Sequence, residues 1–301
     1  MKRNAMIRIV IWSLVIVVLS TVMISVMTGW SLRGRRYRTE TPAATHVPQP
    51  LETVDVQQLP AAEGKTVFSA NEISELEIEW VAGEILIQPG STDQITVRED
   101  GVTDPQYTMV LQHRGEKLKI LFCEENITKA WGISIQGNIS KDLTILVPRD
   151  WFCQSLDIDC ASATVEINDL TIGEVDFDGA SGTCEFENCT VDEIDIDTAS
   201  GDIRFIGELN MLDCDAASAS VYASLSNTPS RLDMDSMSGD LEIILPQDAG
   251  FTLSMDGLST DFTSDFETTV HNGNYVCGDG RCRINLDALS GDVTIRKNAT
   301  P

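Results

Sequence analysis

The chain has 301 residues, enough to bury a sizeable core, and its net charge of −26 is unevenly distributed. All seven basic residues before Thr39 lie in or beside one apolar segment, and all 47 acidic residues begin at Glu40 or later, so residues 39–301 carry −33 (14 Lys and Arg against 47 Asp and Glu). Such a surface repels nucleic acid and anionic lipid head groups, which argues against DNA or RNA binding and leaves metal cations or basic partners as counter-ions.

Residues 9–28 are predicted to form a transmembrane helix behind a short cytoplasmic tail of residues 1–8. Ile9 to Met27 is an uninterrupted run without a charged side chain, and roughly 19 to 20 helical residues cross a hydrocarbon core of about 30 Å. A cleaved signal peptide is the alternative, but the run is long for one and no A-x-A-like cleavage site follows it.

Basic residues on both sides of this span leave two orientations open. Three precede the span and four follow it: Lys2, Arg3 and Arg8, then Arg33, Arg35, Arg36 and Arg38. The positive-inside rule taken literally places the large domain in the cytoplasm. A signal anchor with a very short tail places it outside, with the second cluster against an anionic bilayer. We expect a single-pass cell-membrane protein with an extracellular domain, joined to the span by residues 29–65, a basic juxtamembrane segment followed by a Pro-containing linker.

From residue 66 to residue 298 the sequence predicts an all-β domain. Segments such as ELEIEW, EILIQP and DLTILV alternate apolar and polar residues and are bounded by Gly, Pro, Asn or Asp. The unit LDIDCASATVEI at Leu156 recurs, as in IDIDTASGDIRF at Ile194 and INLDALSGDVTI at Ile284. Its serine recurs at intervals of 19, 19, 18, 20, 21 and 31 residues: Ser162, Ser181, Ser200, Ser218, Ser238, Ser259 and Ser290.

One copy of this unit cannot bury its apolar side alone, so the copies are expected to stack. Leu156 and Ile158 face one way and Asp157 the other, and Val165 returns to the apolar side after a Ser-Gly type of turn. Stacking in register joins these sides into one core, which predicts a parallel β-helix or solenoid with coils of about 20 residues. A β-sandwich of hairpins is the alternative. The long interval before Ser290 is expected to hold a loop or hairpin.

These repeats resemble a bacterial family, the putative-adhesin domain of unknown function built from β-strand repeats, which includes LiaG-like envelope proteins. The resemblance is carried by LEIEWVAGEILIQPG near Leu76, by DLTILVPRD ending at Asp150 and by units such as TASGDIRF and MSGDLEI. It implies a β-helical domain, commonly behind an N-terminal membrane segment, and LiaG-like members are associated with envelope stress. It implies no catalytic residues and no cofactor. The expected function is that of a non-catalytic, membrane-anchored binding or scaffold protein, whose partner is an unidentified envelope protein or glycan.

Two columns of aspartates are the candidate metal site. Stacked coils place equivalent side chains about 4.8 Å apart, where two carboxylates repel by roughly 0.9 kcal/mol even in water. Ca²⁺ could compensate this repulsion and make the domain a Ca²⁺-stabilised structural solenoid. The alternative is a solvated face, with the second Asp of each copy accepting a local backbone hydrogen bond before the turn. The Ca²⁺ candidates are Asp157, Asp159, Asp176, Asp178, Asp195, Asp197, Asp213, Asp215, Asp233 and Asp235.

The remaining candidates for chemistry are cysteines, serines and histidines. The CGDGRC segment could place Cys277 and Cys282 opposite each other in a hairpin as a disulfide, whereas Cys184 and Cys214 are expected inside as small apolar residues. His113 and His271 are isolated, which argues against a serine hydrolase. A β-helical carbohydrate-active enzyme is the enzymatic alternative, although no coil gains a basic residue beside its acids.

Overall fold

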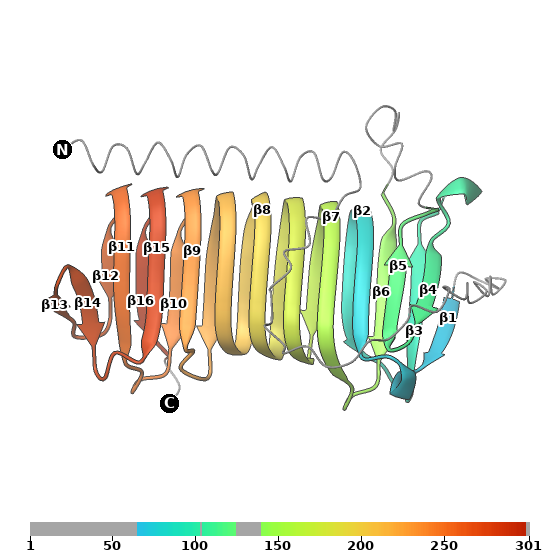
Figure 1. Ribbon diagram of the computed structural model, residues 1–301, viewed down its shortest axis with the longest axis horizontal. Coiled ribbons are helices and arrows are strands. Elements are labelled where there is room, and N and C mark those ends of the chain that lie inside the picture. The colour runs from blue at the N-terminus through green and yellow to red at the C-terminus, as the bar shows by residue number, and fades with distance from the viewer. Residues whose placement is uncertain (1–64, 103, 125–139, 299–301) are drawn as a thin grey trace, which may run out of the picture.

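The computed structural model describes residues 65–102, 104–124 and 140–298, and this part of the chain folds as an elongated β-solenoid (Figure 1). Its only helical elements are the short 3-10 helices η2 (Ala70–Glu72) and η3 (Pro105–Tyr107). No helix among the described residues is long and apolar enough to cross a membrane. The predicted tail, the span of residues 9–28 and the linker up to residue 64 lie outside the described residues.

Each coil consists of two strand segments that meet at a corner. In β7 (Phe152–Asn168), residues 155–160 pair with the first half of β2 (Glu75–Pro89), and residues 162–167 pair with its second half. Both pairings are parallel, so successive coils lie in register. We call the sheet formed by the segments before the corners the leading face, and the sheet formed by those after the corners the trailing face.

The two faces share β2, β7 and the long strand β8 (Thr171–Leu225), which runs through three copies of the repeat. The leading face runs, in spatial order, β4 (Val110–Arg114), β5 (Lys117–Leu121), β2, β7, β8, β9 (Arg231–Ser238), β15 (Cys282–Ser290), β11 (Phe251–Ser259), β14 (Asn274–Cys277) and β13 (Thr269–His271). The trailing face runs β1 (Lys65–Ser69), β3 (Gln94–Asp100), β6 (Asp142–Val147), β2, β7, β8, β10 (Leu241–Leu245), β16 (Val293–Lys297) and β12 (Phe262–Ser264).

Side chains of both faces fill one apolar core. Leu156 and Ile158 before the corner, and Val165 and Ile167 after it, are all at most 1% exposed. Their burial provides the main driving force for stacking the coils. The predicted all-β solenoid is therefore confirmed, and the sandwich alternative is wrong because consecutive copies pair in parallel from coil to coil.

The corners need glycine because adjacent coils approach closely there. Gly201 has φ 151°, and a Cβ on it would lie 2.0 Å from the carbonyl oxygen of Gly182 in the preceding coil. Gly291 has φ 150°, and its Cβ would lie 2.0 Å from the carbonyl oxygen of Gly239. Any side chain at these positions would combine an unfavourable φ with a backbone clash.

The coil that comes last in the chain does not lie last in space. β15 is paired in parallel with β9 on one side and with β11 on the other, and β16 lies between β10 and β12 (Figure 1). Along the chain, β11 and β12 come first and form the coil at the end of the solenoid. The chain then turns back through the β13–β14 hairpin, and β15 and β16 form a coil between that end coil and the coil of β9 and β10. The hairpin occupies the long interval before Ser290, as predicted.

The predicted disulfide between Cys277 and Cys282 is wrong. Both thiols are free, and the two residues pair with Phe251 from opposite sides of β11. Two strand spacings therefore separate them, roughly 9–10 Å, whereas a disulfide needs Cα atoms about 4.4–6.8 Å apart. Cys184 and Cys214 are buried, as expected.

Candidate functional site

The strand register brings the predicted aspartates into two columns on the outer side of the leading face. The first column contains the register pairs Glu77 with Asp157, Asp157 with Asp176, and Asp213 with Asp233. The second column contains Glu79 with Asp159, Asp159 with Asp178, Asp215 with Asp235, Asp235 with Asp287, and Asp287 with Asp256. These columns alternate with the buried apolar residues of the same strands, because successive side chains of a strand point to opposite faces.

The second column is where carboxylate repulsion is largest. Burial, followed by the charges of Asp157 and Asp178, raises the pKa of Asp159 to about 8. Burial and the neighbouring aspartates raise the pKa values of four further members to about 6: Asp178, Asp197, Asp215 and Asp235. At pH 7 Asp159 is therefore mainly protonated, and it hydrogen-bonds the side chain of Asp178. Protons thus neutralise part of the repulsion in this column.

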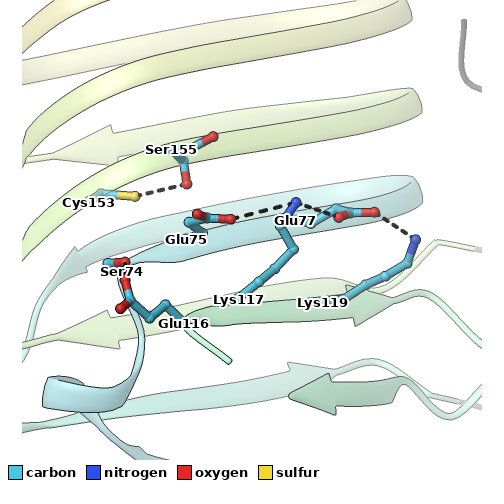
Figure 2. Close-up of polar contacts among 8 residues, drawn as sticks. All are labelled: Ser74, Glu75, Glu77, Glu116, Lys117, Lys119, Cys153 and Ser155. Carbon is cyan, nitrogen blue, oxygen red and sulfur yellow. Dashed lines mark hydrogen bonds and ion pairs between the residues drawn. The ribbon is translucent and has the colours of Figure 1, made fainter. Parts of the chain in front are cut away.

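Lysines neutralise the columns at the β5 end. Lys119 Nζ lies 2.7 Å from Glu77 Oε1, and Lys117 Nζ lies 3.0 Å from Glu77 Oε2 and 3.8 Å from Glu75 (Figure 2). Lys119 also contacts Glu79. Burial opposes the ionised form of Lys119, but hydrogen bonds to Glu77 and Glu79 raise its pKa above the usual value. Burial likewise opposes the ionised form of Glu77, whose pKa the two lysines lower. The lysines and glutamates thus each stabilise the ionised form of the other.

Arg231 at the start of β9 lies beside the first column, so the expectation that no coil adds a basic residue beside its acids is wrong. The Arg231 guanidinium lies 3.4 Å from Asp213 Oδ2 and contacts Asp233, to which Arg231 Nε donates at 2.6 Å. Asn285 of the neighbouring β15 donates to Asp233 Oδ1 at 2.7 Å. Beyond Asp233 the first column continues as Asn285 and Ser254, so its acidic character ends there.

This arrangement does not build a recognisable metal shell. No group of three or more His, Cys, Asp or Glu side chains within residues 65–102, 104–124 and 140–298 is placed to hold a metal ion. Ca²⁺ takes six to eight oxygen ligands that converge on one point. Side chains on one face of a sheet instead project side by side. Ca²⁺ binding by the ten candidate aspartates remains one of the two alternatives that the sequence leaves open, and a solvated face is the other.

The candidate groups for catalysis are separated in the fold. His113 lies in β4 and packs edge-on against Phe68, and His271 lies in β13 at the opposite end of the leading face. Among the corner serines, Ser181 Oγ donates to the Ala161 carbonyl of the adjacent coil at 3.5 Å. The structure therefore places this serine in contact with neighbouring backbone.

Aspartates do cap backbone groups at the corners, but at a different position from the predicted one. The residue that follows the corner glycine accepts from the next coil: Asp240 Oδ1 from the Asp292 N–H at 2.9 Å, and Asp292 Oδ1 from the Asp261 N–H at 3.1 Å. The Gly-Asp pair that recurs in the sequence repeat could have predicted these backbone caps. These carboxylates tie adjacent coils together.

Sequence reasoning also missed a buried ion pair at the β1 end of the solenoid. Lys141 Nζ lies 2.6 Å from Glu99 Oε2, and the two side chains are only 2% and 5% exposed. The ammonium also donates to the carbonyl oxygens of Tyr107 and Phe122, and it lies over the Trp80 ring, 4.7 Å from the centroid. These contacts satisfy the charge, which points to a structural role.

Comparison with known protein families gives a match over part of the chain. Residues 73–208 match the family model described as Toastrack DUF4097, which confirms the resemblance inferred from the sequence. No curated protein matches the chain.

Several solved structures are similar at low sequence identity. A putative cell adhesion protein from Clostridium sporogenes is 10% identical, with 78% of this chain and 98% of that chain covered and a TM-score of 0.34. A putative adhesin from Bacteroides fragilis is 10% identical, with 78% and 96% covered and a TM-score of 0.46. A putative lipid binding protein from Parabacteroides distasonis is 11% identical, with 78% and 96% covered and a TM-score of 0.25. These likenesses are too distant to bear on function.

Proposed function

We propose, starting from the match of residues 73–208 to the Toastrack DUF4097 family, that this chain is a non-catalytic, membrane-anchored, adhesin-like protein of the cell envelope. In this proposal residues 9–28 hold the chain in the membrane, and the solenoid presents a surface that binds or scaffolds an envelope protein or glycan. The resemblance to LiaG-like proteins connects this role with envelope stress.

The observation that carries this proposal is the repetition of the same groups along the leading face. The second column extends from Glu79 on β2 to Asp256 on β11, so eight stacked segments present an acid at one position, and none of them adds a histidine there. An active site concentrates different groups at one place. A repeated surface instead suits an extended partner, which is how solenoid proteins commonly bind.

Membrane placement is tested with the full chain in intact cells. A protease added outside should cut the solenoid away from the membrane fraction, and a chain that lacks residues 9–28 should leave that fraction without any protease. Protection of the domain until the cells are lysed would place it in the cytoplasm and overturn the exterior location.

Binding is tested by co-sedimentation of the purified full chain, in detergent micelles, with purified envelope polysaccharide and with envelope proteins. Saturable binding without any change in polymer length is the expected result. Shortening of the polysaccharide that stops when Asp215 and Asp235 are both changed to Asn would replace the binding function with an enzymatic one. Asp248→Asn, an exposed carboxylate outside the columns, is the matched control.

A further inference from the structure

The two ends of the leading face differ in charge. At one end the acidic columns are flanked by β5 and β4, where Lys117, Lys119 and Arg114 lie on the outer side. Arg114 is exposed and directly opposite Lys117 in the β4–β5 register, which places both side chains on the same side of the sheet. At the other end the second column finishes with the exposed Asp256 on β11.

Strand β11 also has a free edge along two thirds of its length. On one side it pairs with β15 from Phe251 to Ser259, whereas on the other side β14 covers only Phe251–Leu253. Within the described part of the chain, residues 254–259 have no strand partner on that side, and Figure 1 shows the β13–β14 hairpin beside only one end of β11. An uncovered edge of this kind is a template for another strand.

Apolar side chains adjoin this free edge. Leu258 is 63% exposed and Met237 is 37% exposed, and the register places Leu289 between them in one row at the corner. In the preceding coils the same position is occupied by alanine, as at Ala161 and Ala180. The exposed apolar surface of this row therefore increases toward the β11 end.

The opposite end of the leading face has a matching edge. β4 pairs only with β5, so its outer edge has no strand partner among the described residues, and its five residues are comparable in length with the open part of β11. β4 is antiparallel to the coil segments and carries Val110 at its start and Arg114 at its end. β4 of another copy would pair antiparallel with β11 beside the hairpin. A register that sets Arg114 opposite Ser254 sets Val110 opposite Leu258, and Asp256 is then the diagonal neighbour of Arg114 on the same side of the sheet.

We propose that the docking partner of the open β11 edge is a second copy of this chain, which binds head-to-tail through its β4 edge. The basic end of one copy then neutralises the acidic end of the next, as Lys117 and Lys119 do within one copy. Such an interface is heterologous and does not close by two-fold symmetry, so it generates rows of copies along the solenoid axis. This inference goes beyond the envelope-binding proposal and does not depend on it.

The test uses the full chain in detergent micelles, with mass measured by sedimentation velocity up to about 0.1 mM, where an interface with a micromolar Kd is saturated. The wild type should form a concentration-dependent series of oligomers that shortens in 0.5 M salt. Leu258→Asp blocks the β11 end, and Arg114→Glu blocks the β4 end. Each variant alone should remain monomeric up to 0.1 mM, which requires Kd to rise from about 1 μM to about 1 mM or more.

Mixing the two variants distinguishes a head-to-tail contact from a two-fold contact between β11 edges. Each retains one intact end, so an equimolar mixture should form a 1:1 complex that grows no further.

The matched controls are Phe152→Asp, at a side chain that is 52% exposed on β7, and Arg149→Glu, at an exposed arginine away from β4. Both controls should oligomerise like the wild type. A monomeric wild type overturns the proposal, as does a dimer that Leu258→Asp abolishes and Arg114→Glu leaves unchanged, since that pattern indicates a two-fold contact between β11 edges.

Discussion

Asp159 on β7 lies directly opposite Asp178 on β8, and the two carboxyl groups share a hydrogen bond. The pair exists because the repeat places an acid at the same position of consecutive coils, one strand spacing apart. Burial and the like charges around it raise the pKa of Asp159 to about 8, so the pair holds a proton under neutral conditions.

The first prediction is that mild acid stabilises the domain. The native pKa values of the second column, about 8 for Asp159 and about 6 for Asp178, Asp197, Asp215 and Asp235, lie above the ordinary value of 3.8. Between roughly pH 4 and pH 8 the native state therefore binds more protons than the unfolded state, so the free energy of unfolding falls as pH rises. Thermal melts should show Tm increasing from pH 8 to pH 5. A Tm that decreases over this range would contradict the assignment.

Asp159→Asn should reproduce part of this stabilisation at alkaline pH. The amide removes a charge from the most crowded position of the column while keeping the shape of the side chain. We expect Tm at pH 8 to rise by about 2–4 °C, the shift that about 1 kcal/mol produces in a domain of this size, and the change of Tm between pH 6 and pH 8 to become smaller. Asp248→Asn, on an exposed turn, should leave both unchanged. An unaltered pH profile in Asp159→Asn would show that the proton is held elsewhere.

Calcium should stabilise the chain no more than equal ionic strength does. The columns are compensated by protons, by Lys117 and Lys119 and by Arg231, and the described residues provide no converging group of three or more ligands. Tm of the full chain in millimolar Ca²⁺ should therefore match Tm in NaCl of the same ionic strength. A gain of many degrees specific to Ca²⁺, lost in Asp178→Asn, would instead locate a cation site in the second column.

The repeat predicted the solenoid well because each copy specifies the same local structure. The inward side chains of LDIDCASATVEI, from Leu156 to Ile167, are buried, and the Ser-Gly corners have the positive φ that glycine allows. Cys184 and Cys214 lie inside because they occupy apolar positions of the repeat. Periodicity was sufficient for these features, since neighbouring coils decide them.

Features that depend on the choice between similar copies could not be predicted. LSMDGLS in β11 and INLDALS in β15 have the same pattern, so either could stack on β9, and the observed order depends on the hairpin that turns the chain back. The wrong disulfide follows from the same cause, because this order inserts Phe251 between Cys277 and Cys282. The Glu99–Lys141 pair lies outside the repeat and joins residues 42 positions apart, for which no local pattern exists.

Gly201→Ala should strongly destabilise the solenoid. Its Cβ would lie 2.0 Å from the Gly182 carbonyl oxygen at φ 151°, so two coils must separate locally. We expect a loss of about 3 kcal/mol or more, measured by chemical denaturation, because a backbone clash adds to the unfavourable φ. Gly115→Ala is the matched control, since φ there is 62° with open space around the new Cβ, and it should cost only about 1 kcal/mol. Equal losses in the two variants would show that close stacking of the corners is unimportant.

Lys141→Met should destabilise the β1 end of the solenoid by about 3–5 kcal/mol, the usual effect of leaving a buried charge without its partner. Glu99 Oε2 would retain only the Met109 N–H, from which it accepts at 2.9 Å, while its side chain stays 5% exposed. The double variant Lys141→Met with Glu99→Gln should recover a large part of the loss, because the amide needs no counter-charge. Denaturation of the two single variants and the double variant gives the coupling energy of the pair. Additive losses would mean that the contacts of the Lys141 ammonium with the Tyr107 and Phe122 carbonyl oxygens and with the Trp80 ring, and not its pairing with Glu99, provide the stabilisation.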